Sequence, residues 1–179
     1  AELPNDIWQS DVMHGPKVLA DGKLRKSYLV AFIDDHSRLI PYAGFYLSET
    51  VDSILDALKN AVMARGLPTK LYADNGAAFR SKRFEYIVAA LSIALIHSRP
   101  YQPEAKGKIE RLFRTIRNQL LTGYRPISLE QLNRALRTWI VENYHVRRHG
   151  STGETPISRF TREMHCIRAA PDKIRDYFR

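Results

Sequence analysis

The chain has 179 residues, 44% of them hydrophobic, a composition that fits one soluble globular domain and includes no apolar run long enough for a transmembrane helix. The N-terminal residues lack the regions of a signal peptide, and the single cysteine, Cys166, excludes an internal disulfide and a multi-cysteine zinc site. The net charge of +9 lies wholly in residues 99–179, with 17 basic and 8 acidic residues, which predicts a surface for DNA or RNA. An acidic membrane is a less favoured partner, because no basic amphipathic segment carries the bulky aromatic face of an interfacial helix.

The first part of the chain predicts three strands joined by tight turns. The β-forming runs are IWQSDVM (7–13), KSYLVAFIDD (26–35) and LIPYAGFYL (39–47). The turn signals ADGK and DDHSR separate them. Short turns of this kind join antiparallel neighbours, so we expect a three-stranded meander.

Helices and strands then alternate along the chain. Apolar residues at helical spacing predict helices, and short β-forming runs predict strands between them. In order, we expect a helix at 51–65, a strand at 70–73, a helix at 81–91, a strand at 92–97, a helix at 105–121 and a last long helix capped by Ser128. The chain from Tyr144 onward is basic and irregular, and no element is assigned to it.

This order of elements predicts an α/β fold. Three antiparallel strands would be extended by two parallel strands through helical crossovers, giving a mixed five-stranded sheet flanked by helices. Chemistry in such sheets gathers at the carboxyl ends of the strands.

Two acidic residues are expected at that edge of the sheet. Asp11 lies near the end of the first strand, and Asp74 directly follows the strand at 70–73. If those strands are neighbours, the two side chains meet. Each residue also has an ordinary explanation, because Asp11 could cap a loop and Asp74 opens an Asp-Asn-Gly turn.

A third acid, Glu110, lies within KGKIERLFRTIR (106–117), where five of twelve residues are Lys or Arg. It could form i,i+4 ion pairs with Lys106 and Arg114. It also lies at the margin of the apolar face of its helix, from which it would face the strand ends. Three converging carboxylates repel one another, and a divalent cation such as Mg²⁺ removes that penalty. The pattern therefore predicts a metal site beside a polyanion-binding surface.

The spacing of these acids resembles the D,D-35-E signature of retroviral integrases and related bacterial insertion-sequence transposases, since 35 residues separate Asp74 from Glu110. Four further blocks resemble the family's motifs in the family's order. They are WQSD (8–11), IDDHSR (33–38), ADNGAAF (73–79) and RPYQPEAKGKIER (99–111). The segment NYHVRRHGSTGETPISRF (143–160) resembles the one that closes bacterial members. The resemblance covers residues 7 to about 160.

The resemblance implies an RNase H-like fold and a DDE transposase or integrase. Such an enzyme is a metal-dependent polynucleotidyl transferase that nicks DNA 3′ ends and joins them to target DNA. Asp11, Asp74 and Glu110 would be the catalytic metal ligands, holding Mg²⁺ or Mn²⁺, with two ions when DNA is bound. Lys106 stands where retroviral enzymes often carry Gln, so loop contacts need not be the same.

Several side chains are expected to contact DNA. Arg114 and Arg117 occupy positions, four and seven residues after the Glu, that contact element-end DNA in retroviral integrases. On the helix, Lys106 shares their side, whereas Lys108 and Arg111 point elsewhere. The full expected DNA-binding set is Lys106, Arg114, Arg117, Asn75 and Arg148.

The resemblance also bears on organisation. We expect an integrase-like core at 1–160 and a basic extension or linker at 161–179 toward a region outside this chain. Neither a His-His-Cys-Cys zinc module nor an upstream helix-turn-helix is visible, so the chain resembles the catalytic core of a longer transposase. Its expected partners are transposon ends and target DNA. A homodimer or higher multimer is expected, in the bacterial cytoplasm and associated with the nucleoid.

Two other functions remain open at this point, an RNase H-fold nuclease without joining activity and an inactive DNA-binding or assembly module. Asp34 and Asp35 are explained by a hairpin turn, although Asp35 could assist the site. His97 is expected to be a packed or hydrogen-bonded side chain. His145 and His149 could contact phosphate or support local structure.

Overall fold

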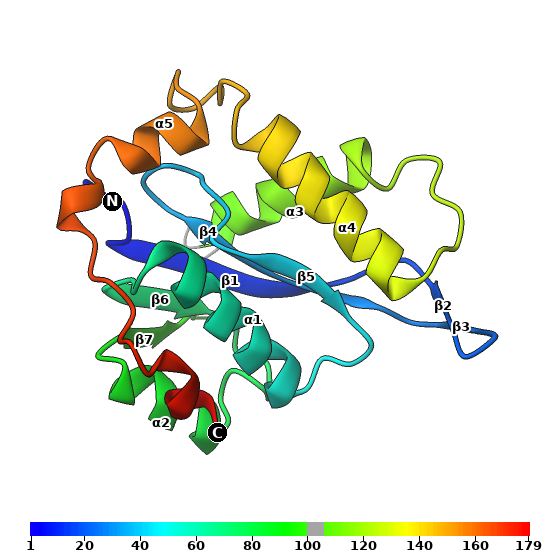
Figure 1. The fold of residues 1–179 in the computed structure, drawn as a ribbon, viewed down its shortest axis with the longest axis horizontal. Coiled ribbons are helices and arrows are strands. Elements are labelled where there is room, and N and C mark those ends of the chain that lie inside the picture. The colour runs from blue at the N-terminus through cyan, green and yellow to red at the C-terminus, as the bar shows by residue number, and fades with distance from the viewer. Residues whose placement is uncertain (100–105) are drawn as a thin grey trace.

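The computed structural model describes residues 1–99 and 106–179 and has a five-stranded mixed sheet at its centre (Figure 1). The strand order is β5-β4-β1-β6-β7. The strands are β1 (Ile7–His14), β4 (Tyr28–Asp34), β5 (Ala43–Tyr46), β6 (Lys70–Ala73) and β7 (Ala94–His97). β4 pairs antiparallel with β1, and β5 pairs antiparallel with β4. On the other side β6 pairs parallel with β1, and β7 pairs parallel with β6, which confirms the predicted sheet.

The central strand β1 differs from its prediction in one respect that concerns Asp11. The strand continues to His14, so Asp11 lies within it rather than near its end. The reason is that β1 has unequal partners. Its antiparallel pairing with β4 runs to His14, whereas its parallel pairing with β6 stops at Ser10 opposite Ala73. Asp11 is therefore the first residue beyond the shorter pairing.

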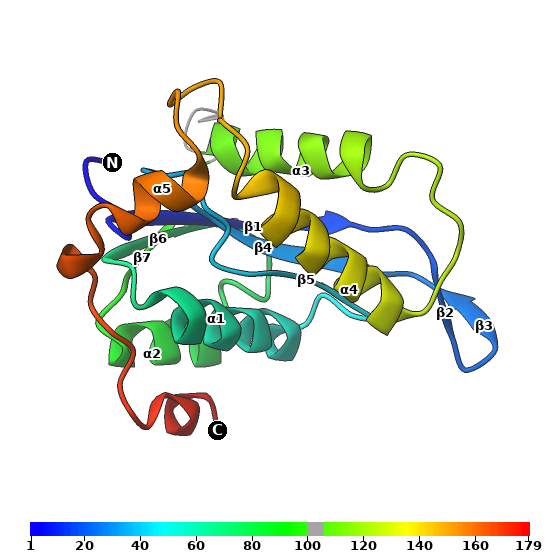
Figure 2. The ribbon, with the colours of Figure 1, turned by 45° about the horizontal axis from the view of Figure 1, so that its top comes forward.

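Helices cover both faces of the sheet (Figure 2). On one face lie α1 (Val51–Arg65) and α2 (Lys82–Ala90), and on the other lie α3 (Gly107–Gln119) and α4 (Leu129–Trp139). The period of two along a strand explains the two apolar layers. Trp8 and Phe32 pack toward α1 and α2, whereas Leu29 and Ile33 pack toward α3 and α4.

Some boundaries depart from the predictions. The β5 strand begins only at Ala43, because Pro41 has no N–H to donate to a sheet. At the predicted ADGK turn the structure also has two short strands, β2 (Val18–Ala20) and β3 (Lys23–Arg25), which pair as a small second sheet. The predicted start of the third helix at Ala105, and most of the RPYQPEAKG stretch, lie outside the described residues.

The last long helix, α4, begins with a capping box. The Ser128 hydroxyl accepts a hydrogen bond from the Gln131 backbone N–H, and the Gln131 side chain accepts one from the Ser128 N–H. Such a box satisfies two backbone donors that the helix itself leaves unpaired. The prediction that Ser128 caps this helix is confirmed.

We expect Ser128→Ala to lower the free energy of unfolding by about 1 kcal/mol, the usual cost of losing an N-cap side chain. Urea unfolding of the two proteins measures the difference. Thr50→Ala is the matched control, because Thr50 is the N-cap of α1 but its side chain makes no capping hydrogen bond. Equal losses in the two variants would contradict the assignment of the cap.

The C-terminal segment is ordered against the rest of the fold, although no elements were predicted there. Beyond the π-helix (Ile140–Tyr144) that extends α4, it contains α5 (Pro156–Thr161) and two 3₁₀ helices (Met164–Cys166 and Ile174–Phe178). The last of these buries Ile174 in the apolar layer under α1 and α2, where the C-terminus lies in Figure 2. Such short elements depend on long-range packing and leave little periodicity in the sequence. None of the described helices has the length and apolar character needed to cross a membrane.

Candidate active site

Asp11 and Asp74 lie side by side where two adjacent parallel strands stop pairing. Ser10 pairs with Ala73, and each acid is the next residue along the chain, Asp11 within β1 and Asp74 directly after β6. The Lys106 ammonium, just before α3, lies between the two carboxylates. Its Nζ atom is 2.6 Å from Asp74 Oδ1 and 3.8 Å from Asp11 Oδ2. The structure thus brings together the two strand acids as expected and places a cation at their meeting point.

The pKa values of the two acids reflect this arrangement. Burial raises the pKa of Asp11, and the charges of Asp74 and Glu110 raise it further, against the lowering effect of Lys106. Burial would also raise the pKa of Asp74, but the hydrogen bond and charge of Lys106 outweigh it and lower that pKa. Lys106 therefore lowers the pKa of both carboxyl groups against the effect of burial.

Glu110 lies in the first turn of α3 and is exposed to solvent. Its charge contributes to the raised pKa of Asp11. The Gln9 side chain fixes the start of this helix, because its carbonyl oxygen accepts a hydrogen bond of 3.1 Å from the Ile109 N–H. Sequence reasoning gave Gln9 no role, although it lies within the WQSD block.

These oxygen donors suit a hard divalent cation such as Mg²⁺, which binds carboxylates together with water and phosphate oxygens. The Lys106 ammonium lying between Asp11 and Asp74 is itself a cation held by the same two groups. The three acids are nevertheless not drawn into one compact cluster. A different group of three potential ligands is compact among the described residues, because its ligand atoms all lie within 4.8 Å of one another.

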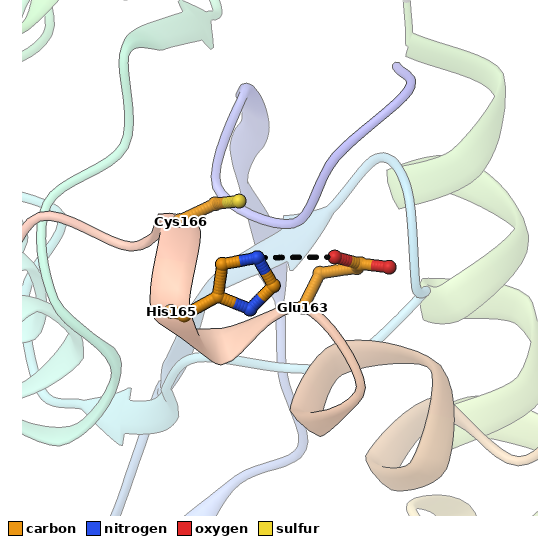
Figure 3. A group of neighbouring side chains, drawn as sticks. All are labelled: Glu163, His165 and Cys166. Carbon is orange, nitrogen blue, oxygen red and sulfur yellow. Dashed lines mark ion pairs between the residues drawn. The ribbon is translucent and has the colours of Figure 1, made fainter.

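That other group is Glu163, His165 and Cys166 (Figure 3). Nε2 of His165 lies 3.6 Å from Oε2 of Glu163, and both His165 and Cys166 are exposed. All three residues belong to one short stretch around a 3₁₀ turn, so their proximity follows from local sequence. No role follows for Cys166.

The loop that carries Asp74 is tied to the end of β7. The Asn75 amide donates to the Ser98 carbonyl, and Nδ1 of His97 lies 3.3 Å from the Asp74 carbonyl oxygen. His97 is thus hydrogen-bonded, as expected. An added Cβ at Gly76 would lie 3.2 Å from Oδ2 of Asp74, so a larger residue there would crowd the carboxylate.

The two rival acids have structural partners. Asp34 is fully buried and accepts hydrogen bonds from the backbone of Asn5 and from both the N–H and hydroxyl of Ser37, which explains it as a turn residue. Asp35 pairs with Lys108 on α3. It therefore helps to anchor the helix that carries Glu110.

The expected DNA-binding residues fall into two places. Arg114 and Arg117 are exposed on the same side of α3 as Glu110, spaced four and seven residues after it. Arg148 lies elsewhere, near Lys108 and Arg111 on a different side of the helix. His145, considered for phosphate contact, is instead buried, and its Nε2 accepts a hydrogen bond of 3.0 Å from the Ile40 N–H.

We expect Lys106→Gln to raise the pKa of Asp74, because the substitution removes both the hydrogen bond and the charge that lower it. Carboxyl ¹³C NMR titration measures this pKa. The matched control is Lys108→Gln, which removes the partner of Asp35 and should raise the pKa of that residue while leaving Asp74 unchanged. An unshifted Asp74 in Lys106→Gln would contradict the contact.

Comparison with known proteins agrees with this geometry. Residues 1–103 match the family described as integrase core domain, and residues 91–156 match a second family with the same description. The transposase for transposon Tn552 of Staphylococcus aureus is 29% identical over 88% of this chain and 37% of its own length. The Pol-related polyprotein of a mouse intracisternal A-particle is 31% identical over 82% of this chain and 17% of its own length. The chain therefore spans less than half the length of these relatives.

Solved structures show the same fold. The intasome of simian T-cell lymphotropic virus, solved with a PP2A regulatory subunit, contains a chain with a TM-score of 0.74 and 24% identity, covering 96% of this chain and 58% of that one. The HTLV-2 integrase catalytic core domain in complex with magnesium has a TM-score of 0.65 and 25% identity, covering 88% of this chain and 97% of that one. The predicted RNase H-like fold is thereby confirmed.

Proposed function

We propose, because the chain belongs to the integrase core domain family, that it is the catalytic core of a DDE polynucleotidyl transferase acting in transposition or DNA integration. Its reaction would be nicking of DNA 3′ ends followed by transfer of those ends to target DNA. The observation that carries the proposal is the meeting of Asp11 and Asp74 around one cation, with Glu110 on the adjacent helix. The relatives, a transposase and a Pol-related polyprotein, support the same reaction class.

Asp11, Asp74 and Glu110 would hold Mg²⁺ or Mn²⁺, and we propose two ions when DNA is bound. The HTLV-2 integrase catalytic core domain was solved in complex with magnesium, which supports the choice of ion. Bound there, such ions supply Lewis acidity that lowers the pKa of an attacking hydroxyl and offsets charge developing at phosphorus.

The chain's own residues would prepare this chemistry. Lys106 lowers the pKa of both Asp11 and Asp74, and its ammonium would be free to contact a DNA phosphate when those carboxylates hold a metal ion. Gln9 and Asp35 hold the start of α3, and thereby the position of Glu110.

The remaining expected DNA contacts are proposed for exposed cations and for one amide. Arg114 and Arg117 would neutralise phosphates beside the acids, and such contacts carry little sequence information. The Asn75 amide already donates a hydrogen bond to the Ser98 carbonyl, so Asn75 would act in DNA binding through the loop that it stabilises. Arg148 would contact DNA on a different side of α3, near Lys108 and Arg111.

We extend the proposal to organisation. Residues 1–160 would form the catalytic core and residues 161–179 a basic extension from it toward a further region. The working form would be a homodimer or higher multimer on transposon ends and target DNA, in the bacterial cytoplasm at the nucleoid. Relatives solved as dimeric and trimeric cores support multimerisation.

A branched DNA that mimics the product of strand transfer tests the proposed function. Incubated with Mn²⁺, the protein should cut the branch and rejoin the freed strand. A denaturing gel separates the rejoined product from the substrate. Cleavage without rejoining would instead favour an RNase H-fold nuclease. Binding of the DNA with neither reaction would favour an inactive assembly module.

A further inference from the structure

A second basic site lies on a different side of α3 from Glu110. It is a pocket of about 150 Å³, enough for several water molecules and hence for one phosphate group. Three segments form it, namely α3, the end of β4 with the turn that follows it, and residues 144–150, which begin at the last residue of the π-helix. The cationic side chains that line it are Arg38, Lys108, Arg111, Arg147 and Arg148.

The pocket concentrates positive charge. Among the described residues, no Asp or Glu lines the pocket. Lys108 is paired with Asp35, and no ion pair joins the other four cations to a described acid. The charge affects a neighbouring side chain, His149. Burial and then the charges of Arg38 and Arg111 lower the pKa of His149. A concave, cationic surface of this kind focuses the field and attracts anions.

Hydrogen bonds link the segments that form the pocket. The Tyr144 hydroxyl donates a hydrogen bond of 2.7 Å to the Arg38 carbonyl oxygen. Arg147 donates to the Gln119 side chain at 3.2 Å, and Arg111 donates to the Ser151 hydroxyl at 3.1 Å. These bonds tie the segment after the π-helix to the turn and to α3.

The backbone conformation of Arg38 also indicates that this site is specialised. Its φ of 68° lies in the left-handed region, which residues other than glycine, asparagine and aspartate rarely occupy. That conformation costs free energy for an arginine, so its occurrence in the lining of a cationic pocket indicates that the Arg38 side chain is needed there. The apolar floor, Ile33 and Leu112, is almost fully buried and gives the pocket a fixed base.

We propose that this pocket binds a backbone phosphate of DNA. Arginine guanidinium groups match the tetrahedral oxygens of a phosphate with paired hydrogen bonds. The proposal rests on the proposed function for its ligand, because DNA is the polyanion that such a core would handle. It goes further in giving the NYHVRRHG segment and the two α3 cations, Lys108 and Arg111, a common task.

The bound phosphate is not the reacting one. Lys108, Arg111 and Thr115 line the pocket from one stripe of α3, whereas Glu110 and Arg114 belong to another. With side chains, a helix is about 10–12 Å across. The pocket would therefore hold a DNA segment on the far side of α3 from the acids, either a distant part of the same duplex or a second one.

Binding of a short blunt duplex at a series of salt concentrations, with EDTA present, tests this inference without any catalysis. The test protein is the double variant Arg111→Gln/Arg148→Gln. Removing one phosphate contact should reduce the slope of log affinity against log salt by about 0.9. The charge-retaining variant Arg111→Lys/Arg148→Lys should restore most of that slope.

The matched control is Lys59→Gln/Lys173→Gln, which removes the same charge from the other face of the sheet, where α1 and the C-terminal segment lie (Figure 2). It should bind as the wild type does. A wild-type slope in the pocket variant would overturn the proposal, and so would an equal loss in the control, which would indicate a general charge effect. Circular dichroism and melting curves confirm that each variant is folded.

Inorganic phosphate could satisfy the same chemistry, so its binding is followed separately by ³¹P line broadening. Phosphate binding that is lost in the pocket variant, together with unchanged DNA affinity, would overturn the DNA assignment and leave a free-ion site. A core that fails to join DNA but shows the pocket effect would reject the proposed function alone. Failure of the wild type to bind DNA would overturn both.

Discussion

Glu110→Gln should reduce rejoining of the branched DNA by about 10³-fold, the scale on which loss of one preorganised charged or polar group acts in an active site. The substitution keeps the size and exposure of the side chain and removes only its charge. Because Glu110 is exposed at the first turn of α3, the fold should be unaffected. The measurement is the single-turnover rate with Mn²⁺ and saturating DNA.

Glu130→Gln is the matched control for this experiment. Glu130 is also an exposed acid in the first turn of a helix, but it belongs to α4. It should rejoin DNA at the wild-type rate. Near-wild-type activity in Glu110→Gln would show that the acid forms only ion pairs with its cationic neighbours, the ordinary explanation of its position.

His145 should make the fold sensitive to acid. Burial and the charge of Arg65 lower its pKa from 6.5 to about 4, so the folded state holds a neutral ring. The unfolded state therefore binds more protons between these values. The stability from this residue is fully present above about pH 6.5 and is lost as the pH falls through about 4. A shift of this size corresponds to up to about 3 kcal/mol.

His145→Gln tests this expectation, because glutamine can still accept the hydrogen bond from the Ile40 N–H but does not titrate. Urea unfolding at several pH values should show the wild type losing stability relative to the variant between pH 6.5 and 4. Asp11 and Asp34 have raised pKa values and act in the opposite direction, but they do so equally in both proteins. Parallel pH curves would contradict a buried neutral His145.

The sheet and its helices were predictable because their signals are local. Alternating and apolar runs marked the strands, and the cap at Ser128 marked the start of α4. The meeting of Asp11 and Asp74 was also predictable, since it follows from two parallel strands becoming neighbours. The identity of the family could be inferred from the order and spacing of its motifs.

Other features depend on contacts between distant segments and leave no local pattern. Lys106 was expected to face DNA, but in the structure it lies between two carboxylates contributed by residues 32 and 95 positions earlier. The anchoring of α3 through Gln9 spans 100 residues. The pocket around Arg38 and Arg148 likewise joins segments that only the folded chain brings together.

Titration of Mn²⁺ into the protein–DNA complex, followed by calorimetry, tests the central claim most directly, which is that the three acids form a metal site. Mn²⁺ should bind the wild type and the control Asp172→Asn, whose acid is exposed and lies in the C-terminal segment, and binding should be lost in Asp74→Asn. Equal Mn²⁺ binding by wild type and Asp74→Asn would contradict the account, because the cation would then be held elsewhere.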